Sequence, residues 1–428
     1  MSATARESAG ALLWRLWRDR AAWSATSDIF AVMIAASLPW STSLVAIFAA
    51  AFLVSLLRFP DFMGLLRSLK CPVCVLPAAL FALAAIGTLW SIAPWSERLY
   101  ALGPATKLLM LPVMLFHFER SARGAKVFIV FLASCALLMT FSWIVAFDPK
   151  LALKSGAEYG VPVKNYIDQS QEFALCAVAL AYPIVTLLRT KKFRLAALLM
   201  ALALGFVVNM LFVSVSRTAL VTIPGMLAVF ALLHLKWRNI VIIACATVVL
   251  GGLAWATSPQ LRWTTETFFR DYQLYKQQNI PTSIGLRLVF WEKSLRFISE
   301  APLFGHGTGS IRGLFEEASV NQFGAEAEVV ANPHNQTLNV AIQWGAVGTV
   351  VLYAMWLVHL LLFRGDGLAT WIGLMVVVQN IFTSLFNSHL SDFNEGWMYV
   401  LGVGIAGGMV LGSRSREAAV AARDRTQP

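Results

Sequence analysis

The chain has 428 residues, of which 58% are hydrophobic and only 13% are charged. Because soluble domains carry roughly 25% charged residues, this composition excludes an ordinary soluble fold. The formal net charge of +11 does not indicate a nucleic-acid partner, since the Lys and Arg residues stand in short clusters between apolar runs, as they do in membrane proteins.

Apolar runs of roughly 20 residues are typical of membrane-spanning helices. The sequence contains twelve such runs, and the first two are short and divided only by Trp40 and Ser41. The first run leads straight into others without a small-residue cleavage site, so no cleavable signal peptide is expected. The chain is therefore predicted to be an all-α polytopic membrane protein. The predicted spans cover residues 27–41, 43–57, 73–90, 104–119, 125–147, 170–188, 195–214, 217–235, 239–257, 336–362, 367–386 and 395–412.

The basic residues predict the orientation of these spans, because cytoplasmic connectors are enriched in Lys and Arg. With the N-terminus in the cytoplasm, 21 of the 34 basic residues fall in cytoplasmic segments. The outer connector that carries Lys150, Lys154 and Lys164 is an exception to the rule. Both termini are thus predicted to be cytoplasmic. The 21 residues are Arg6, Arg15, Arg18, Arg20, Arg58, Arg67, Lys70, Arg120, Arg123, Lys126, Arg189, Lys191, Lys192, Arg194, Lys236, Arg238, Arg364, Arg414, Arg416, Arg423 and Arg425.

Residues 258–335 form one long polar segment, which this orientation places outside the cytoplasmic membrane. The predicted organisation has spans one to nine in residues 1–257, the loop in 258–335, and spans ten to twelve in 336–412. The polar residues 413–428 are expected to be a disordered cytoplasmic tail.

Within the loop, residues 286–300 are predicted to form an amphipathic helix that ends before Pro302. Apolar residues recur on one of its faces at helical spacing. Such a face fits either the bilayer surface or the rest of the protein, and the sequence leaves both open. The residues of this face are Leu288, Trp291, Leu295 and Ile298.

His334 is the candidate general base. Asn332 is a favourable N-cap and Pro333 suits the first helical position, so His334 is predicted to lie in the first turn of the tenth span. The positive end of the helix dipole disfavours an imidazolium there, which leaves a neutral imidazole that can accept a proton. A histidine that only caps or anchors the helix is the alternative.

Two arginines are candidates for binding an anion. Arg217 follows a favourable N-cap, Ser216, at the outer start of the eighth span, and Arg287 begins the loop helix. A cation at a helix N-terminus is electrostatically unfavourable unless an anion, such as a phosphate, binds there too. A snorkelling side chain at Arg217 and a solvated charge at Arg287 are the alternatives.

Two further basic residues are candidates for the site. Lys107 lies near the outer end of the fourth span, where a buried cation requires an anionic partner, and Arg262 adds positive charge to the loop.

Residues 305–309 are glycine-rich and are predicted to form a turn rather than a phosphate cradle. No Walker A, H-E-x-x-H or G-x-S-x-G pattern occurs, and Cys71 and Cys74 form a lone C-x-x-C, so neither a metal site nor a cofactor is predicted.

The ordered set of these segments resembles the O-antigen ligase family, within the O-antigen ligase/polymerase superfamily. Ser216-Arg217-Thr218-Ala219 is similar to the family's S-R-T/G segment. Arg287 through Trp291 to Pro302-Leu303-Phe304-Gly305-His306-Gly307 is similar to its R-x-x-x-W and P-x-x-G-x-G segments. Pro333-His334-Asn335 with Leu338 is similar to its H-N-x-x-L motif. The layout of spans and loop also matches the family over the whole chain.

The resemblance implies a GT-C-like fold with about 12 transmembrane helices and one large periplasmic loop, in the bacterial inner membrane. It implies transfer of an O-polysaccharide from undecaprenyl diphosphate to a sugar hydroxyl of lipid A–core at the periplasmic face. The transfer would invert C1 and use no metal, nucleotide or other cofactor. By position, His334 would activate the acceptor hydroxyl, and Arg217 and Arg287 would hold the diphosphate.

Supporting roles are expected for Arg262, Lys107 and Asn335. Asp392, with His389 just before it, resembles a further acidic position of the family. Its carboxylate would orient His334 or the acceptor, and a solvated turn residue is the alternative.

Three other functions compete with the ligase. An O-antigen polymerase or a protein O-oligosaccharyltransferase would use the same lipid-linked donor and differ only in the acceptor. A twelve-span transporter is a different class. A major-facilitator transporter would have a long cytoplasmic connector after the sixth span, where this chain has only residues 189–194.

Overall fold

The computed structural model describes residues 20–56, 61–154, 156 and 158–424, and no strand occurs in this part of the chain. The basic residues Arg6, Arg15, Arg18, Arg58 and Arg425, which contribute to the predicted orientation, lie outside the described residues. The predicted all-α polytopic architecture is confirmed.

Each of the twelve predicted spans coincides with a helix or with consecutive helices. Among the described helices, eight segments are long and apolar enough to cross a membrane, and four more are apolar but shorter. Twelve as the number of spans therefore stays a prediction. The corresponding helices are α2 Arg20–Ser37, α3 Thr42–Leu56, α5 Pro72–Ile86, α6 Trp95–Thr106 with η1 Lys107–Leu109 and α7 Met110–Phe118, α8 Gly124–Phe147, α9 Tyr166–Ala179 with α10 Ala181–Arg189, α11 Phe193–Phe212, α12 Arg217–His234, α13 Trp237–Thr257, α17 Gln336–Leu362, α18 Leu368–Thr383 and α19 Phe393–Asp424, while α4 Phe62–Ser68 is a short connector.

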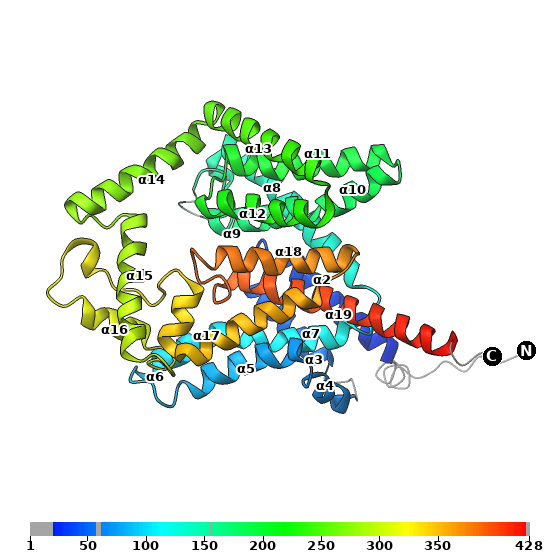
Figure 1. The fold of residues 1–428 in the computed structure, drawn as a ribbon, viewed down its shortest axis with the longest axis horizontal. Coiled ribbons are helices and arrows are strands. Elements are labelled where there is room, and N and C mark those ends of the chain that lie inside the picture. The colour runs from blue at the N-terminus through cyan, green and yellow to red at the C-terminus, as the bar shows by residue number, and fades with distance from the viewer. Residues whose placement is uncertain (1–19, 57–60, 155, 157, 425–428) are drawn as a thin grey trace, which may run out of the picture.

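The apolar helices form two groups, with α9 to α13 (green) beside a second group that contains α2, α3, α5, α7, α17 and α19 (Figure 1). Helix α18 packs against α9, α12 and α19 and joins the two groups. Small residues let α19 approach α7 closely: a Cβ on Gly404 would lie 2.7 Å from the Met114 Cβ, and one on Gly408 would lie 2.7 Å from the Leu115 carbonyl oxygen. Close backbone approach at small residues is a common way to pack helices in membranes.

The C-terminal segment is helical where a disordered tail was predicted. Helix α19 continues without a break to Asp424, through residues that were expected to be a disordered tail. The segment is rich in Ala, Arg and Glu, which have high helix propensity. Because it extends a helix that already exists, it bears no nucleation cost. Residues 425–428 lie outside the described part.

The long polar segment folds into helices of its own, which lie together at one end of the molecule (Figure 1). They are α14 Pro259–Gln278, α15 Ser283–Glu300, α16 Ile311–Ala318 and the short η3 Gly324–Ala327. Helix α14 was not predicted, since it carries no long apolar run. Its start follows the usual rules, with Pro259 in the first turn and the Ser258 hydroxyl accepting from the Leu261 N–H at 3.1 Å.

The predicted loop helix is confirmed as α15, but the face that it buries differs from the prediction. Phe290 and Phe297 are buried against Phe315 of α16 and Ile342 of α17. Leu288 and Leu295, two residues of the predicted face, are 38% and 62% exposed. The two phenylalanines recur one heptad apart and bury more apolar area than the leucines, which decides the packing. Trp291 and Ile298 are partly buried at the edge of this contact.

The glycine-rich stretch forms the predicted turn. Its backbone N–H groups are used by the protein: His306 donates to the Ile342 carbonyl (2.8 Å), Gly307 to that of Gln343 (2.9 Å) and Thr308 to that of Gly87 (3.0 Å). These amides are therefore not available to cradle a phosphate. The turn instead ties the loop to α17, close to the kink at Gly345, whose φ is 59°.

We predict that Gly307→Ala lowers the unfolding temperature of the purified protein in detergent. Gly307 has a φ of 87°, and a Cβ would lie 2.5 Å from the Ser91 Cα. The left-handed conformation alone costs an L-residue roughly 1–2 kcal/mol. Gly313→Ala is the matched control, because a Cβ on Gly313 meets nothing within 4 Å in helix α16 and should leave the unfolding temperature unchanged or raise it. Equal melting of the two variants would contradict the role given to the turn.

Candidate functional site

His334 lies just before α17 rather than in its first turn. The helix begins at Gln336, and its N-cap is Asn335, whose Oδ1 accepts from the Leu338 N–H at 3.1 Å. The predicted cap, Asn332, is used differently: its Oδ1 accepts from the His334 N–H (3.0 Å) and from the Ser388 hydroxyl (2.6 Å). His334 takes a left-handed φ of 54° as a result. The predicted span of 336–362 thus coincides with α17, while the predicted N-cap is wrong by three residues.

The His334 imidazole is packed into the protein. It stacks on the ring of Phe290 in α15, with ring centres 6.2 Å apart and planes 27° apart. Burial and the positive charge of Arg287 lower the pKa of His334 below its usual value of 6.5, against a smaller opposing contribution from the hydrogen bond with Asn387. Burial and the charge of Arg287 thus favour the neutral imidazole that was expected from the sequence.

Asn387 is the polar partner of the His334 ring. The Nδ1 atom of His334 lies 3.2 Å from the Asn387 Oδ1, and the Asn387 Nδ2 lies 3.0 Å from the His389 Nε2. An amide oxygen only accepts hydrogen bonds, so this orientation places the His334 proton on Nδ1. The Nε2 atom then carries the lone pair and is the atom that can accept a proton.

Arg217 opens α12 as predicted. The Ser216 side chain, however, makes no capping hydrogen bond. The guanidinium pairs with the Asp271 carboxylate of α14, with both terminal nitrogens 3.3–3.4 Å from the same oxygen, and lies 6.0 Å from the Phe268 ring centre. An anion does accompany the arginine at this helix start, and in the structure that anion is a side chain from the loop.

Arg287 lies in the second turn of α15 rather than at its start. Burial lowers the pKa of its guanidinium, the Tyr166 side chain raises it, and the charge of Arg217 lowers it, so these three side chains lie near one another. Among the described residues, Arg287 forms no ion pair. The structure thus brings His334, Arg287 and Arg217 together from three separate parts of the chain.

Two of the predicted supporting residues, Lys107 and Asn335, make defined contacts within the protein. Lys107 is buried, and its ammonium group donates to the backbone carbonyls of Ser391 (2.9 Å) and Asp392. The Asp392 and Glu395 carboxylates also interact with it electrostatically, as expected for a buried cation. Asn335 caps α17 and donates from Nδ2 to the Leu385 carbonyl at 3.1 Å. Arg262 lies in the first turns of α14, and no polar contact within the described residues ties it to the other basic side chains.

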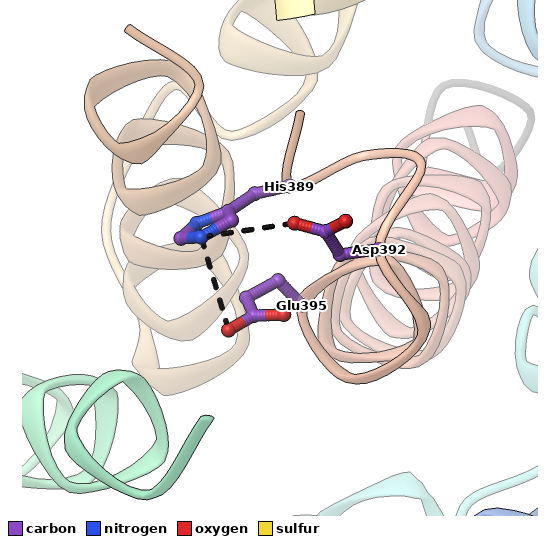
Figure 2. A group of neighbouring side chains, drawn as sticks. All are labelled: His389, Asp392 and Glu395. Atoms are coloured by element: carbon purple, nitrogen blue, oxygen red, sulfur yellow. Dashed lines mark ion pairs between the residues drawn. The ribbon is translucent and has the colours of Figure 1, made fainter. Parts of the chain in front are cut away.

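Asp392 does not contact His334, and Asn387 occupies that position, so only its role toward the acceptor stays a prediction. The Asp392 carboxylate faces His389 instead, together with Glu395 (Figure 2). The Nε2 of His389 is 3.9 Å from the Asp392 Oδ2 and 4.0 Å from the Glu395 Oε1. Burial raises the pKa of Asp392 to about 6 and lowers that of His389 to about 3.

His389, Asp392 and Glu395 are close enough to share one cation, because one ligand atom from each lies within 4.8 Å of the others. The sequence did not predict this group, because residues at i, i+3 and i+6 match no established metal motif. The Nε2 lone pair of His389 already receives the Asn387 N–H. Among the described residues, the His389 Nδ1 and the Glu395 Oε1 have no hydrogen-bond partner.

A cavity of about 1230 Å³ adjoins the loop that carries His334. It lies between α3, α6, α7, α17 and α19, and Asn332, Gln336 and Asp392 are among its lining residues. Arg217 and Arg287 are not among them. The residues two positions before and after His334 thus line this space, and neither arginine does.

Comparison with known proteins identifies the segment that carries this site. Residues 202–353 match the family described as O-antigen ligase. This segment belongs to the O-antigen ligase family. It contains Arg217, Arg287 and His334, so the family predicted from their motifs is confirmed.

A protein of Haemophilus influenzae that bears the name "Uncharacterized protein" is also similar to this chain. The two are 25% identical over 260 residues, which make up 58% of this chain and 62% of that protein. The chain thus spans less than two thirds of that relative's length.

We predict that the detergent-purified protein binds inorganic diphosphate, and that Arg287→Gln weakens this binding about 10- to 100-fold. A hydrogen bond to a charged group contributes roughly 1.5–3 kcal/mol, which corresponds to that factor. Asp271→Asn should strengthen binding, because it removes the carboxylate that competes for Arg217. Arg296→Gln is the matched control, since Arg296 is 72% exposed and pairs only with Glu300. Calorimetry at fixed ionic strength measures all three, and weaker binding by Asp271→Asn would contradict the competition.

Proposed function

We propose that this protein is an O-antigen ligase, which transfers an O-polysaccharide from undecaprenyl diphosphate to a sugar hydroxyl of lipid A–core. The family match supports the broader statement, a multi-pass membrane enzyme of the glycosyltransferase type that acts on lipid-linked glycans. The observation that carries the specific proposal is a histidine whose pKa is lowered by burial and by Arg287, an arginine that lies near Arg217 and has no acidic partner among the described residues.

The donor diphosphate binds between Arg217 and Arg287. Guanidinium groups suit phosphate oxygens because they donate two parallel hydrogen bonds. The diphosphate replaces Asp271 at Arg217, where the carboxylate makes long contacts of 3.3–3.4 Å through a single oxygen. Arg287 requires no such exchange, which makes it the first contact for the arriving anion.

The transfer then proceeds as a single displacement. The acceptor hydroxyl gives its proton to Nε2 of His334 as its oxygen forms a bond to C1 of the donor sugar. The bond from C1 to the phosphate oxygen breaks, and its electron pair stays on the diphosphate. Attack from the face opposite the leaving group inverts C1. The two arginines stabilise the charge that develops on the phosphate, which is the contribution a metal ion makes elsewhere.

The two substrates reach His334 from different sides. The donor occupies the side of the arginines, and the cavity lined by Asn332, Gln336 and Asp392 receives the sugar of the acceptor. Both are lipids, so each approaches laterally from the bilayer. This arrangement fits an inner-membrane protein with its site at the periplasmic face and both termini in the cytoplasm.

We predict that His334→Ala abolishes transfer from an undecaprenyl-diphosphate-linked glycan to purified lipid A–core. Loss of a general base typically costs about 10²- to 10⁴-fold in rate. His306→Ala is the matched histidine control, since the His306 Nε2 only contacts the Phe297 carbonyl in the loop, at 2.8 Å. Retained transfer by His334→Ala would remove the proposed base.

The same assay separates the competing functions. Transfer by the wild type to a growing glycan or to a protein, with none to lipid A–core, would favour a polymerase or a protein O-oligosaccharyltransferase. Transport of a lipid-linked glycan without any transfer would favour a transporter. Transfer that stops when EDTA is added would contradict the metal-independent mechanism.

We predict that the transfer rate has an acid limb with its midpoint below pH 6.5 and reaches a plateau above it. Burial and the charge of Arg287 lower the folded pKa of His334 below 6.5, so the neutral imidazole predominates at neutral pH. Protonation below the folded pKa removes the lone pair on Nε2 and with it the base. A pH profile of kcat/KM for the donor tests this, because it reports the free enzyme, and an acid limb with its midpoint above pH 6.5 would contradict it.

A further inference from the structure

Asn387 joins two histidines in the loop between α18 and α19. Its side chain is buried, at 5% exposure. Its oxygen faces Nδ1 of His334 at 3.2 Å, and its nitrogen faces Nε2 of His389 at 3.0 Å. An amide has one accepting and one donating end, so the orientation of this single group determines which ring nitrogen of each histidine carries the proton.

We propose that Asn387 is a positioning residue that holds His334 in the Nδ1–H tautomer, so that Nε2 is the basic atom facing the acceptor. This inference rests on the proposed function, in which His334 accepts the proton of the acceptor hydroxyl. Asn387 itself touches neither substrate in that scheme and acts only through the imidazole.

Reversal of the amide would have the opposite effect. The Asn387 nitrogen would then donate to Nδ1 of His334, and the His334 proton would move to Nε2, where a proton acceptor is needed. On the other side, His389 would have to donate from Nε2 to the amide oxygen. The tautomers of the two rings are therefore coupled through Asn387, and only one of the two arrangements leaves a base at Nε2 of His334.

His389 is the second half of this arrangement. It is 1% exposed, and burial keeps its imidazole neutral, so it has one donor and one acceptor nitrogen. Asp392 and Glu395 are 3.9 and 4.0 Å from its Nε2, beyond hydrogen-bond distance. Asn387 is therefore the group that hydrogen-bonds this nitrogen, and in the observed orientation His389 Nε2 accepts.

Neighbouring hydrogen bonds hold the Asn387 amide and the His334 imidazole in place. The Asn387 N–H donates to the Thr383 carbonyl at the end of α18 (3.1 Å). The next residue, Ser388, donates through its hydroxyl to the Asn332 side chain (2.6 Å), which also accepts from the His334 backbone (3.0 Å). Both partners of the 3.2 Å contact are thus fixed by the same pair of side chains, Ser388 and Asn332.

The first experiment compares two variants of the full-length protein in the transfer assay. Asn387→Leu is similar in shape but makes no hydrogen bond, so both His334 tautomers become populated and the ring is less well oriented. We expect kcat to fall about 10- to 100-fold while KM for the donor is unchanged, because the misplacement of a catalytic group typically costs that much. Asn387→Asp still accepts from Nδ1, so it should retain most of kcat, with the acid limb of its pH–rate profile moved to higher pH by the added negative charge.

Asn209→Leu is the matched control. Asn209 is another fully buried amide, in α11, and its nitrogen donates to the Ser142 hydroxyl at 3.0 Å. Its replacement removes a comparable hydrogen bond that involves neither histidine, so kcat of the folded protein should stay at the wild-type value. A loss of kcat in Asn387→Leu no larger than in Asn209→Leu would overturn the proposal, as would an Asn387→Asp variant as inactive as Asn387→Leu.

The second experiment does not depend on activity. Nitrogen NMR of protein with isotope-labelled histidine rings distinguishes the two tautomers, and the His334 signal is assigned by its absence in His334→Ala. We expect Nδ1–H at His334 in the wild type and in Asn387→Asp, and a mixture in Asn387→Leu. An unchanged tautomer in Asn387→Leu, or Zn²⁺ or Mg²⁺ binding at His389 that displaces the amide, would overturn the inference. Retained transfer by His334→Ala would instead overturn the proposed function and leave the tautomer result standing.

Discussion

The site depends on the hydrogen bonds that join the first residue of α17 to the loop between α18 and α19. Gln336 is 2% exposed, and its N–H donates to the Ser384 carbonyl at 2.9 Å. Its side-chain oxygen accepts from the N–H groups of Leu390 (3.0 Å) and Ser391 (3.2 Å). A buried polar group left unpaired costs roughly 1–3 kcal/mol, so these contacts favour one docking of the two segments. His334 precedes Gln336 by two residues, and its partner Asn387 lies within the docked loop.

A single electrostatic field explains two properties of the site. Arg217 and Arg287 lie near each other, and Arg287 also lies near His334. Unlike charges attract across a partly buried site far more strongly than in bulk water, so this pair of cations favours a bound phosphate. The same positive potential disfavours a proton on His334. In the proposed mechanism, the groups that hold the anionic leaving group therefore add to burial in keeping the base neutral.

The sequence was sufficient for the apolar helices, while the roles that it gives to Arg217, Arg287 and His334 stay predictions. Apolar length is a strong signal, and each predicted span coincides with helical structure. Helix α14 was missed because it has no apolar run, and α19 was ended too early because a polar composition does not exclude a helix that another helix nucleates. The N-cap of α17 was misplaced because Asn332 and Asn335 both suit an N-cap, and the choice between them is made by Ser388, 56 residues further along the chain. No sequence pattern points to Asn387, because its contact with His334 forms only when the loop between α18 and α19 docks on the start of α17.

The Arg217–Asp271 pair connects the membrane part to the loop, and this gives donor binding a structural consequence. Asp271 lies on α14, and the Thr282 hydroxyl before α15 donates to its backbone carbonyl at 2.8 Å. The carboxylate therefore belongs to the same helical unit that carries Arg287. When a diphosphate takes the place of Asp271 at Arg217, α14 loses its ion pair with α12 while α15 gains a ligand through Arg287. Linkage is reciprocal, so any change that weakens the contact of α14 with α12 must favour diphosphate binding to the same extent that binding weakens the contact. On the proposed function, the polar loop is thus a component of the anion site and not only a cover over it.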